Sequence, residues 1–322
     1  MNAKITGVGG YVPEKVYDNA YMESIVDTSD EWIIRRTGVK ERHISDDNEY
    51  TSDMAIKASQ IALENSGLKA EELDLIILAT VTPDYFTPAC ACLVQKALGA
   101  VNAAAFDYNA ACSAFVTGLT IAKQFIAAGT YKNVLVVCAD TLSKATDYAD
   151  RATCVLFGDA AGAAVVSATE ENGIMETELG SDGDLAITAL AYRNSDEENE
   201  KRVSKRKETI WMAGQAVMKF AVKAMADASL RVLEKSGLSW DDITLVIPHQ
   251  ANYRIVDSAI KRMGITEDKV FLTLEKYGNT SASCIPVALS EAVAEGRIKK
   301  GDKIILVGFG GGLTWGAALL EW

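Results

Sequence analysis

An internal duplication constrains the fold of this chain more than any other feature of its sequence. A helical pattern that ends in Ser66-Gly67-Leu68 is followed by an acidic turn and by the apolar strand pattern Leu73–Thr80. The same order recurs later in the chain, where a helical pattern from Ala224 ends in Ser236-Gly237-Leu238 before a second acidic turn and the strand pattern Ile243–Ile247. Self-similarity of this extent predicts two structural units of the same design.

A second pair of elements extends the duplication. The helical pattern Ser113–Ala128 and the strand that follows it are echoed by the helical pattern Ile285–Glu295 and a strand after that helix. Gly129 ends the first of these helices and Gly296 ends the second, so the two glycines correspond to each other. Carried back along the helices, this alignment predicts that Cys112 lies opposite Asn279.

The order of the predicted elements indicates the fold class. Apolar strands that alternate with helices are typical of α/β proteins whose sheets are covered on both faces. We therefore expect an α/β fold of two halves, residues 1–172 and 173–322, which agrees with a length of 322 residues. The stretch 193–207 is dense in mixed charge, and we expect it to be a solvated loop.

Composition and charge exclude several classes of function. The net charge of −12 argues against a nucleic-acid partner. No apolar run approaches the ~18 residues of a membrane span, and the N-terminus lacks the apolar core of a signal peptide, so we expect a cytoplasmic protein. The glycines at positions 7, 9 and 10 precede Pro13 rather than a helix, which argues against a dinucleotide-binding loop.

Six cysteines are scattered through apolar segments, without the paired spacing of a zinc site. We expect no metal. Five of the cysteines are interpreted as buried, reduced packing residues. They are Cys90, Cys92, Cys138, Cys154 and Cys284.

Cys112 is the exception, because of its local sequence. It follows the short apolar segment Ala103–Tyr108 and opens a long helical pattern, so it is predicted to lie at a helix N-terminus. Unpaired N–H groups and the helix dipole stabilise a thiolate there, and nucleophilic cysteines in such settings reach pKa values of roughly 3.5–7.5. The alternative is a small packing residue under a tightly packed helix.

The chain has only two histidines. His43 lies among charges in a segment that resembles a surface turn, whereas His249 follows the duplicated strand, where open α/β sheets place their ligand sites. Asn279 precedes a helix, and its simplest interpretation is a turn or cap residue. Because the duplication places Asn279 opposite Cys112, we expect Cys112, His249 and Asn279 to converge.

A Cys, His and Asn set without an acidic partner suits acyl-thioester chemistry. The cysteine takes an acyl group, and neutral donors stabilise a second thioester as its enolate. A cysteine protease uses the same residue types, but two similar halves are not its usual organisation. The loop Gly308–Gly316 either supplies an oxyanion-hole N–H beside the Cys112 amide or serves only tight packing.

With these motifs, the chain resembles the thiolase superfamily over essentially its whole length. Within it, the chain is most similar to the β-ketoacyl-acyl carrier protein synthase III family, the initiating condensing enzymes of bacterial type II fatty acid synthesis. The motifs that carry the resemblance, besides those of Cys112, His249 and the terminal glycine loop, are Thr28–Ile33, Arg36-Thr37-Gly38, Gly158–Ala163 and Gly278–Ala282.

The resemblance implies a five-layered α-β-α-β-α fold, a homodimer and a ping-pong reaction without a cofactor, in which acyl-CoA is a substrate. Cys112 would accept the acyl group, with the amides of Cys112 and Gly311 as the oxyanion hole. Malonyl-acyl carrier protein would then lose CO2, with His249 and Asn279 stabilising the enolate. The product would be a 3-oxoacyl-acyl carrier protein.

The resemblance also implies binding residues. Trp32 and Arg151 would sandwich the CoA adenine, which cation–π attraction favours. The other residues of the CoA channel would be Thr28, Arg36, Thr37, Leu156, Phe157, Met212, Gly214, Ala251 and Asn252. A basic surface for the acidic carrier protein would come from Lys219, Lys223, Arg254, Lys261 and Arg262.

Two departures from the family pattern lie beside the nucleophile. Ala114 stands where the family usually has glycine, and Asn109 stands where a smaller residue is usual. The segment Thr82–Pro88 corresponds to one that reaches the acyl pocket of the partner subunit. Thr87 is small at that place, which predicts that acyl chains longer than acetyl are accepted.

Three other functions remain to be distinguished from a primary condensing enzyme. A specialised relative would make a secondary-metabolite ketide or transfer the acyl group to another nucleophile. A degradative thiolase would need a second catalytic cysteine near the C-terminus, and Cys284 lies in a different motif. A non-catalytic subunit that binds acyl-CoA or carrier protein would not need a nucleophile.

Overall fold

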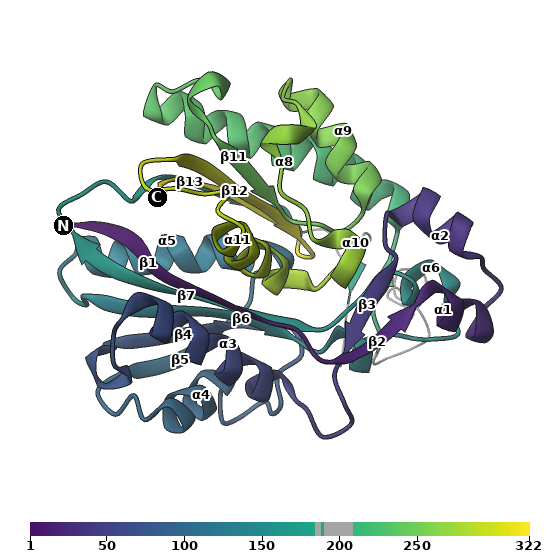
Figure 1. Cartoon of the computed structure of the whole chain (residues 1–322), viewed down its shortest axis with the longest axis horizontal. Helices are drawn as coiled ribbons and strands as arrows, with labels where there is room; N and C mark the ends of the chain where they lie inside the picture. Colours follow the sequence, from purple (N-terminus) through teal and green to yellow (C-terminus); the bar gives the residue numbers. More distant parts are fainter. Residues whose placement is uncertain (184–187, 190–208) are drawn as a thin grey trace.

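The computed structural model describes residues 1–183, 188–189 and 209–322 and shows two sheets flanked by helices (Figure 1). Within these residues the first sheet has five strands in the order β1-β7-β6-β4-β5, and the second has four in the order β11-β12-β13-β8. The strands of the first sheet are β1 (Asn2–Tyr11), β4 (Leu75–Ala79), β5 (Ala104–Tyr108), β6 (Asn133–Asp140) and β7 (Ala160–Thr169). Those of the second sheet are β8 (Ile174–Ser181), β11 (Leu245–Pro248), β12 (Lys303–Gly310) and β13 (Thr314–Glu321).

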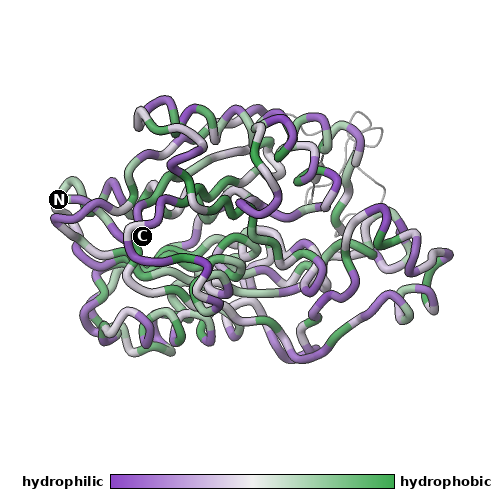
Figure 2. The backbone as a smooth tube through the Cα atoms, turned by 45° about the horizontal axis from the view of Figure 1, so that its top comes forward, coloured by the Kyte–Doolittle hydropathy of each residue, from purple (hydrophilic) through white to green (hydrophobic). Residues whose placement is uncertain are grey.

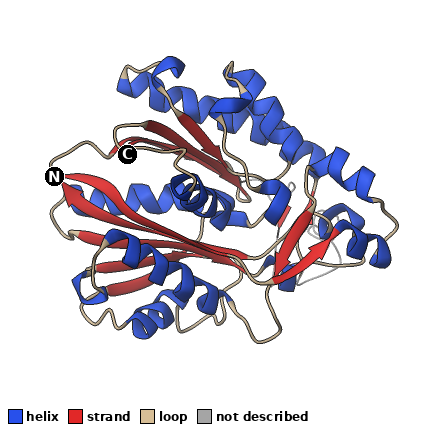
Figure 3. Ribbon diagram, viewed as in Figure 1, coloured by secondary structure: helices blue, strands red, loops and turns tan. Residues whose placement is uncertain are grey.

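Helices form three layers around the two sheets (Figure 3). One pair covers the outer face of the first sheet, one pair lies between the sheets, and one pair covers the outer face of the second sheet. In that order, the pairs are α3 (Thr51–Ser66) with α4 (Cys90–Leu98), α5 (Ala114–Ala127) with α11 (Cys284–Ala294), and α8 (Gly214–Ser236) with α9 (Tyr253–Met263). The expected α-β-α-β-α layers are therefore confirmed.

Burial of apolar side chains holds the layers together. The inner faces of both sheets pack with α5 and α11 into one buried cluster, so the two halves share a core. Hydrophobic stretches gather along the strands in the interior, and hydrophilic ones lie mainly at the periphery (Figure 2). In the residues that the structure describes, no helix is long and apolar enough to cross a membrane.

The duplication extends to the register of the strands. Leu75 of β4 pairs with Val134 of β6, and at the corresponding place in the second half Leu245 of β11 pairs with Ile304 of β12. We propose that the two halves divide at residue 172, which lies between the end of β7 at Thr169 and the start of β8 at Ile174.

The predicted alignment of Cys112 with Asn279 is wrong by three residues. The short turns that precede the central helices, η2 (Ala111–Ser113) and η6 (Ser281–Ser283), are offset by the same amount as the paired strands, so Cys112 lies opposite Ala282. The offset between the glycines that end the two helices is shorter, because α11 has 11 residues and α5 has 14. Helix length, rather than the position of the preceding turns, changed between the two copies.

Beside the two sheets lies a side lobe, made of β2 (Lys15–Asp18), α1 (Asn19–Ile25), α2 (Asp30–Thr37), β3 (Glu41–Ile44), α6 (Arg151–Cys154), β9 (Thr188–Ala189) and β10 (Trp211–Met212). Buried Arg42 joins three of its segments. The guanidinium donates to Asn19 Oδ1 at 2.9 Å, Tyr17 O at 3.2 Å and Val155 O at 2.7 Å. Burial lowers the pKa of Arg42 to about 10, which still leaves it protonated at neutral pH.

Other short elements connect the layers, namely η1 (Ala70–Glu72), η3 (Leu142–Ala145), η4 (Trp240–Asp242), η5 (Glu267–Lys269) and α10 (Leu274–Tyr277). Of the five cysteines expected to be buried, four are, but Cys92 is exposed on α4, so that prediction is wrong. Its helix lies on the outer layer, where a position can face solvent. The predicted solvated loop 193–207 lies outside the described residues.

The glycines of β1 serve close packing. A Cβ atom on Gly9 would lie 2.3 Å from the carbonyl oxygen of Ala58, and one on Gly7 would lie 2.3 Å from that of Ala62. Both carbonyls belong to α3, so the glycines let this helix lie directly on the strand. The interpretation that these residues form no nucleotide site agrees with this packing.

We predict that Gly9→Ala destabilises the protein by about 1–3 kcal/mol, because the added methyl group overlaps backbone that cannot move alone. Chemical denaturation measures the change. Gly10→Ala is the matched control, since its Cβ atom would meet the nearest atom, Val287 Cα, at 3.4 Å, an ordinary contact. Equal stability of the two variants would contradict the prediction.

Candidate active site

Cys112 lies in η2, which joins β5 to the first residues of α5. The predicted place at a helix N-terminus is confirmed. Ala111 adopts a left-handed backbone with φ of 45°, and its N–H donates to Asn109 Oδ1 at 2.9 Å. This short polar contact holds the turn and presents Cys112 beyond the carboxyl end of β5.

The end of β12 packs directly on this turn. A Cβ atom on Gly310 would lie 2.5 Å from the backbone nitrogen of Cys112, and one on Gly308 would lie 3.2 Å from its carbonyl oxygen. Thr314 donates from its hydroxyl to Ala110 O at 2.9 Å, which ties the turn to the start of β13. The tight packing foreseen for this loop is present, and Gly311 follows Gly310 in the segment beside the Cys112 amide.

Burial controls the protonation of Cys112. The residue is half-buried, and its sulfur lies 3.6 Å from the hydroxyl of Ser281. Loss of water around the sulfur raises the pKa of the Cys112 thiol to about 12, and the hydrogen bond with Ser281 opposes this rise only in part. The low pKa expected from the helix terminus is therefore not found, because desolvation of a thiolate outweighs these interactions.

His249 follows β11 and is fully enclosed. Its backbone N–H donates to Val307 O at 2.7 Å, and its ring packs edge-on against Phe309, with centroids 4.9 Å apart. Nδ1 lies 2.8 Å from the sulfur of Cys284. Burial lowers the pKa of His249 to about 3, so the imidazole is neutral at physiological pH.

Asn279 lies just before η6, and the backbone fixes it on both sides. Its N–H donates to Leu156 O at 2.8 Å, and its carbonyl accepts from Gly158 N–H at 3.1 Å. The side-chain oxygen accepts from Ser281 N–H at 2.9 Å. Since Oδ1 is occupied, the side-chain NH2 is the group that Asn279 can offer to a ligand.

The segment from Asn279 to Cys284 brings the three predicted residues together. It contains Asn279, its Ser281 contacts the sulfur of Cys112, and its Cys284 contacts His249. The expected convergence is therefore present, although it comes from this one segment rather than from the alignment predicted by the duplication. His43 lies elsewhere, half-buried in β3, where Nδ1 bonds the carbonyl oxygen of Pro13.

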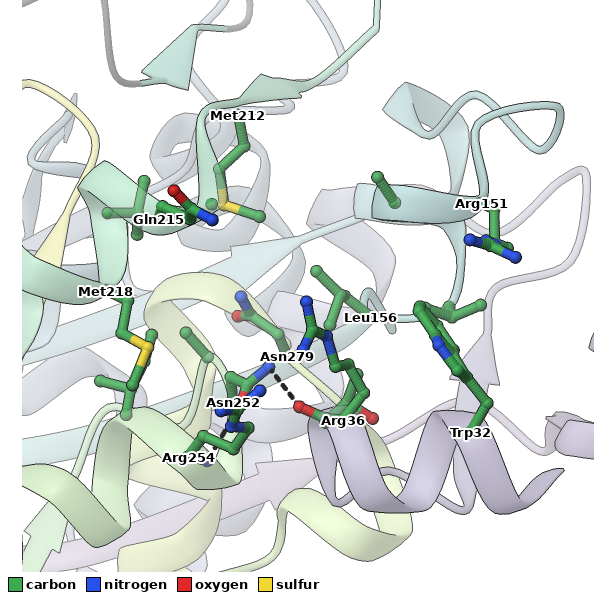
Figure 4. A pocket seen from close by; sticks show the side chains of 17 residues that line it. Trp32, Arg36, Arg151, Leu156, Met212, Gln215, Met218, Asn252, Arg254 and Asn279 are labelled. Atoms are coloured by element: carbon green, nitrogen blue, oxygen red, sulfur yellow. Dashed lines mark hydrogen bonds between the residues drawn. The ribbon is translucent and has the colours of Figure 1, made fainter. Parts of the chain in front are cut away.

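A cavity of about 560 Å³ reaches this segment at Asn279, whereas Cys112 and His249 are not among its lining residues (Figure 4). Nine residues predicted for the CoA channel line it. They are Trp32, Arg36, Thr37, Arg151, Leu156, Met212, Gly214, Ala251 and Asn252. Figure 4 shows Trp32 and Arg151 together at one side, well separated from Met218 of α8.

Trp32 and Arg151 stack on each other in the side lobe, with the guanidinium carbon 4.8 Å from the ring centroid. Arg151 also donates to Asp27 O at 2.8 Å. A flat base between them would need about 3.5 Å on each side, so the two side chains must separate to sandwich an adenine.

Two residues predicted for the channel do not line the cavity. Phe157 is buried beside the backbone of Asn279, and Thr28 lies in the side lobe. Within the described residues, the hydroxyl oxygen of Thr28 is buried and without a hydrogen-bond partner. Asn252 caps α9 with its side-chain oxygen and donates to Arg36 O at 3.1 Å.

Sequence reasoning missed one wall of the cavity, formed by Gln215, Val217 and Met218. These residues lie in the first turns of α8, which begins at Gly214 rather than at the predicted Ala224. The apolar spacing of Val217, Ala221 and Ala224 was the signal for this longer helix. Arg254, which the resemblance assigns to carrier-protein docking, is exposed near the start of α9 and also lines the cavity.

The other predicted docking residues, Lys219, Lys223, Lys261 and Arg262, lie exposed on α8 and α9. Three of them form ion pairs, Lys223 and Arg262 with Asp227 and Lys261 with Asp257. Thr87 is exposed in the loop between β4 and α4 and does not line the cavity of its own chain.

Comparisons with known proteins agree with this geometry. The model of the 3-oxoacyl-[acyl-carrier-protein (ACP)] synthase III family matches residues 106–183, and that of its C-terminal part matches residues 233–322. A β-ketoacyl-[acyl-carrier-protein] synthase III of Clostridioides difficile is 54% identical over 100% of this chain and 99% of its own length.

Solved structures give the same result. The crystal structure of 3-oxoacyl-[acyl-carrier-protein] synthase III from Aquifex aeolicus is 47% identical, with a TM-score of 0.92 over 99% of this chain and 100% of that one. The priming β-ketosynthase of the R1128 polyketide pathway is 34% identical, with a TM-score of 0.93 over 99% and 96%. This chain belongs to the β-ketoacyl-acyl carrier protein synthase III family of condensing enzymes, which has the thiolase-like fold.

Proposed function

We propose that this chain joins an acyl-CoA starter to malonyl-acyl carrier protein by decarboxylative Claisen condensation, the first step of type II fatty acid synthesis. The products are a 3-oxoacyl-acyl carrier protein, CO2 and CoA. The observation that carries the proposal is the single segment from Asn279 to Cys284, which touches both Cys112 and His249 and whose Asn279 lines the cavity.

The first half of the reaction is acyl transfer to Cys112. The sulfur attacks the carbonyl carbon of acyl-CoA, and the carbonyl oxygen becomes an oxyanion. Backbone N–H groups of Cys112 and Gly311 stabilise it, an arrangement supported by the direct contact of Gly310 with the Cys112 amide. The intermediate collapses to an acyl-cysteine, and CoA leaves after taking the thiol proton.

The second half is decarboxylation and carbon–carbon bond formation. As malonyl-acyl carrier protein loses CO2, negative charge develops on its thioester oxygen. His249 and the NH2 of Asn279 donate to this oxygen, and a neutral imidazole suits the task because burial keeps the pKa of His249 at about 3. The resulting carbanion attacks the carbonyl carbon of the acyl-cysteine, and the Cys112 sulfur departs as a thiolate that takes a proton from water.

Acyl-CoA is a substrate, and the proposed steps need no metal or other cofactor. In the described part of the chain, no three side chains of metal-ligating type cluster together. We propose that Trp32 and Arg151 hold the adenine and that Thr28 donates to the nucleotide, since its hydroxyl has no partner in the part of the chain that the structure describes. For Phe157, which is buried, we propose a role in supporting the channel wall from behind.

For the carrier protein, we propose docking on the cations of α8 and α9. Lys219, Lys223, Lys261 and Arg262 are exposed on these two helices, and Arg254 stands at the cavity. Ion pairs of three of them with aspartates of the same helices reduce the local positive potential. Attraction of an acidic partner by such a surface weakens as salt rises.

We propose a homodimer formed along the edge of the first sheet. In the described residues β5 pairs with β4 alone, so its outer edge is open. Apolar side chains near this edge are exposed, with 73% of Val101, 59% of Tyr85 and 39% of Phe106 accessible. Thr87, on the same exposed loop as Tyr85, would then reach the acyl pocket of the partner subunit. The expected cytoplasmic location also remains a proposal.

A specialised acyltransferase or ketide synthase is the second candidate, because the R1128 priming β-ketosynthase shares the fold and 34% of the sequence. Such an enzyme would form the same acyl-cysteine and differ in the acceptor. The experiment on acyl transfer below separates the two functions.

We predict that acyl-CoA forms a covalent adduct on Cys112 that malonyl-acyl carrier protein discharges with release of CO2. Intact-mass spectrometry with a panel of acyl-CoAs detects the adduct, and Cys112→Ala abolishes it. The small Thr87 predicts adducts with chains longer than acetyl. An adduct that only another acceptor discharges indicates the specialised enzyme, and no adduct with any CoA contradicts both functions.

The rate of Cys112 acylation should rise with pH between 6 and 9, by up to about tenfold per unit, because the reactive thiolate is a small fraction below the raised pKa of about 12. No inflection is expected near pH 6.5, since the pKa of His249 is lowered to about 3. Rapid-quench intact-mass measurements follow the adduct, with His249→Gln as control. A plateau at neutral pH would contradict the burial argument.

Trp32→Ala and Arg151→Ala should each raise the KM for acyl-CoA by about tenfold, since stacking on a base contributes about 1–3 kcal/mol. Steady-state kinetics measure the change. An acyl-pantetheine substrate, which lacks the adenine, should be unaffected by either substitution. Arg297→Ala removes a similar cation–π contact, 5.7 Å from the Phe271 ring, and serves as control. Equal KM increases for both substrates would refute adenine binding here.

A further inference from the structure

Cys284 lies against the imidazole ring of His249. It is the first residue of α11, and its sulfur is 2.8 Å from Nδ1 of the ring. Both residues are enclosed, with 3% of Cys284 and 1% of His249 accessible. The condensation proposed above assigns Cys284 no task, although it is the side chain bonded to Nδ1.

The contact requires one proton between sulfur and nitrogen. Burial lowers the pKa of His249 and raises the pKa of Cys284, so both groups are neutral. Either the thiol S–H donates to Nδ1, or Nδ1–H donates to the sulfur. In the first case the ring carries its proton on Nε2, which can donate to a substrate oxygen, and in the second case Nε2 can only accept.

The backbone around the sulfur favours the first arrangement. The N–H groups of Gln250 and Ile285 are directed toward the sulfur, whereas the N–H of Cys284 itself donates to Ser281 O. If Nδ1 carried the ring proton, its N–H would be one more donor directed at a sulfur that backbone N–H groups already face. The hydrogen of the Cys284 thiol needs an acceptor, and Nδ1 of His249 is an acceptor within hydrogen-bond distance of the sulfur.

We propose that Cys284 is a positioning residue whose thiol donates to Nδ1 of His249 and keeps the ring proton on Nε2. His249 is then ready to donate to the thioester oxygen of malonyl-acyl carrier protein during decarboxylation. This arrangement transfers no proton, because one hydrogen stays on the Cys284 sulfur and the other stays on Nε2 of His249. The proposal rests on the proposed function for the role of His249, and the tautomer itself does not depend on that role.

Nitrogen NMR of the full-length protein tests the tautomer directly. The chain has only two histidines, so His43→Gln leaves the signals of His249 alone in a histidine-labelled sample. We expect a bare Nδ1 and a protonated Nε2. Cys284→Ala should shift this population toward the opposite tautomer, and Cys284→Ser, which keeps a donor at the same place, should restore it.

Kinetics of the two half-reactions provide the second readout. Cys284→Ala should slow CO2 release from malonyl-acyl carrier protein by about tenfold or more and slow acylation of Cys112 less, because the acylation step does not use Nε2–H. Cys284→Ser should recover most of the loss. Cys138→Ala removes another buried thiol from the same core and should leave both steps near the parent rate.

A protonated Nδ1 in the parent protein would overturn the proposal, as would parental CO2 release by Cys284→Ala. If that variant does not fold, the parent spectrum and Cys284→Ser still decide. Failure of the proposed function would appear separately, as a parent protein that forms no acyl-cysteine or does not condense. The NMR measurement needs no substrate, so it distinguishes the two failures.

Discussion

The contact between the turns η2 and η6 is the constraint on which the site depends. These turns start the two helices of the central layer, and the sulfur of Cys112 meets the hydroxyl of Ser281 where they touch. Both sheets pack on the same pair of helices in one core. A shift of one half against the other would therefore separate Cys112 from His249 and Asn279, the residues proposed to act with it.

The two turns share a local structure but not a task. Asn109 accepts a hydrogen bond from Ala111 N–H, and Asn279 accepts one from Ser281 N–H, both at 2.9 Å. Only Asn279 is among the residues that line the described cavity. The duplication supplied the same turn twice, and the cavity lies beside only one of the two asparagines.

The alternation of strands and helices was sufficient to predict two similar α/β halves with covered sheets, while the five layers followed from the family resemblance. The convergence of Cys112, His249 and Asn279 was expected from the duplication and from the place of His249 after a strand. The sequence misaligned Cys112 with Asn279, since an offset measured at helix ends mixes position with helix length. It also could not give the pKa of Cys112, which depends on desolvation by distant segments. A charge on a helix does not reveal whether it also borders a cavity, which is why the place of Arg254 in the cavity wall was not predicted.

Arg42 has a consequence beyond the shape of the side lobe. Its planar fork fixes three segments by direction as well as distance, and its partners there are uncharged oxygens. A permanent positive charge therefore sits behind Val155, which lines the cavity. Mobile ions cannot approach a buried charge closely, so the attraction between Arg42 and a polyanionic ligand should persist at salt concentrations that screen the exposed lysines.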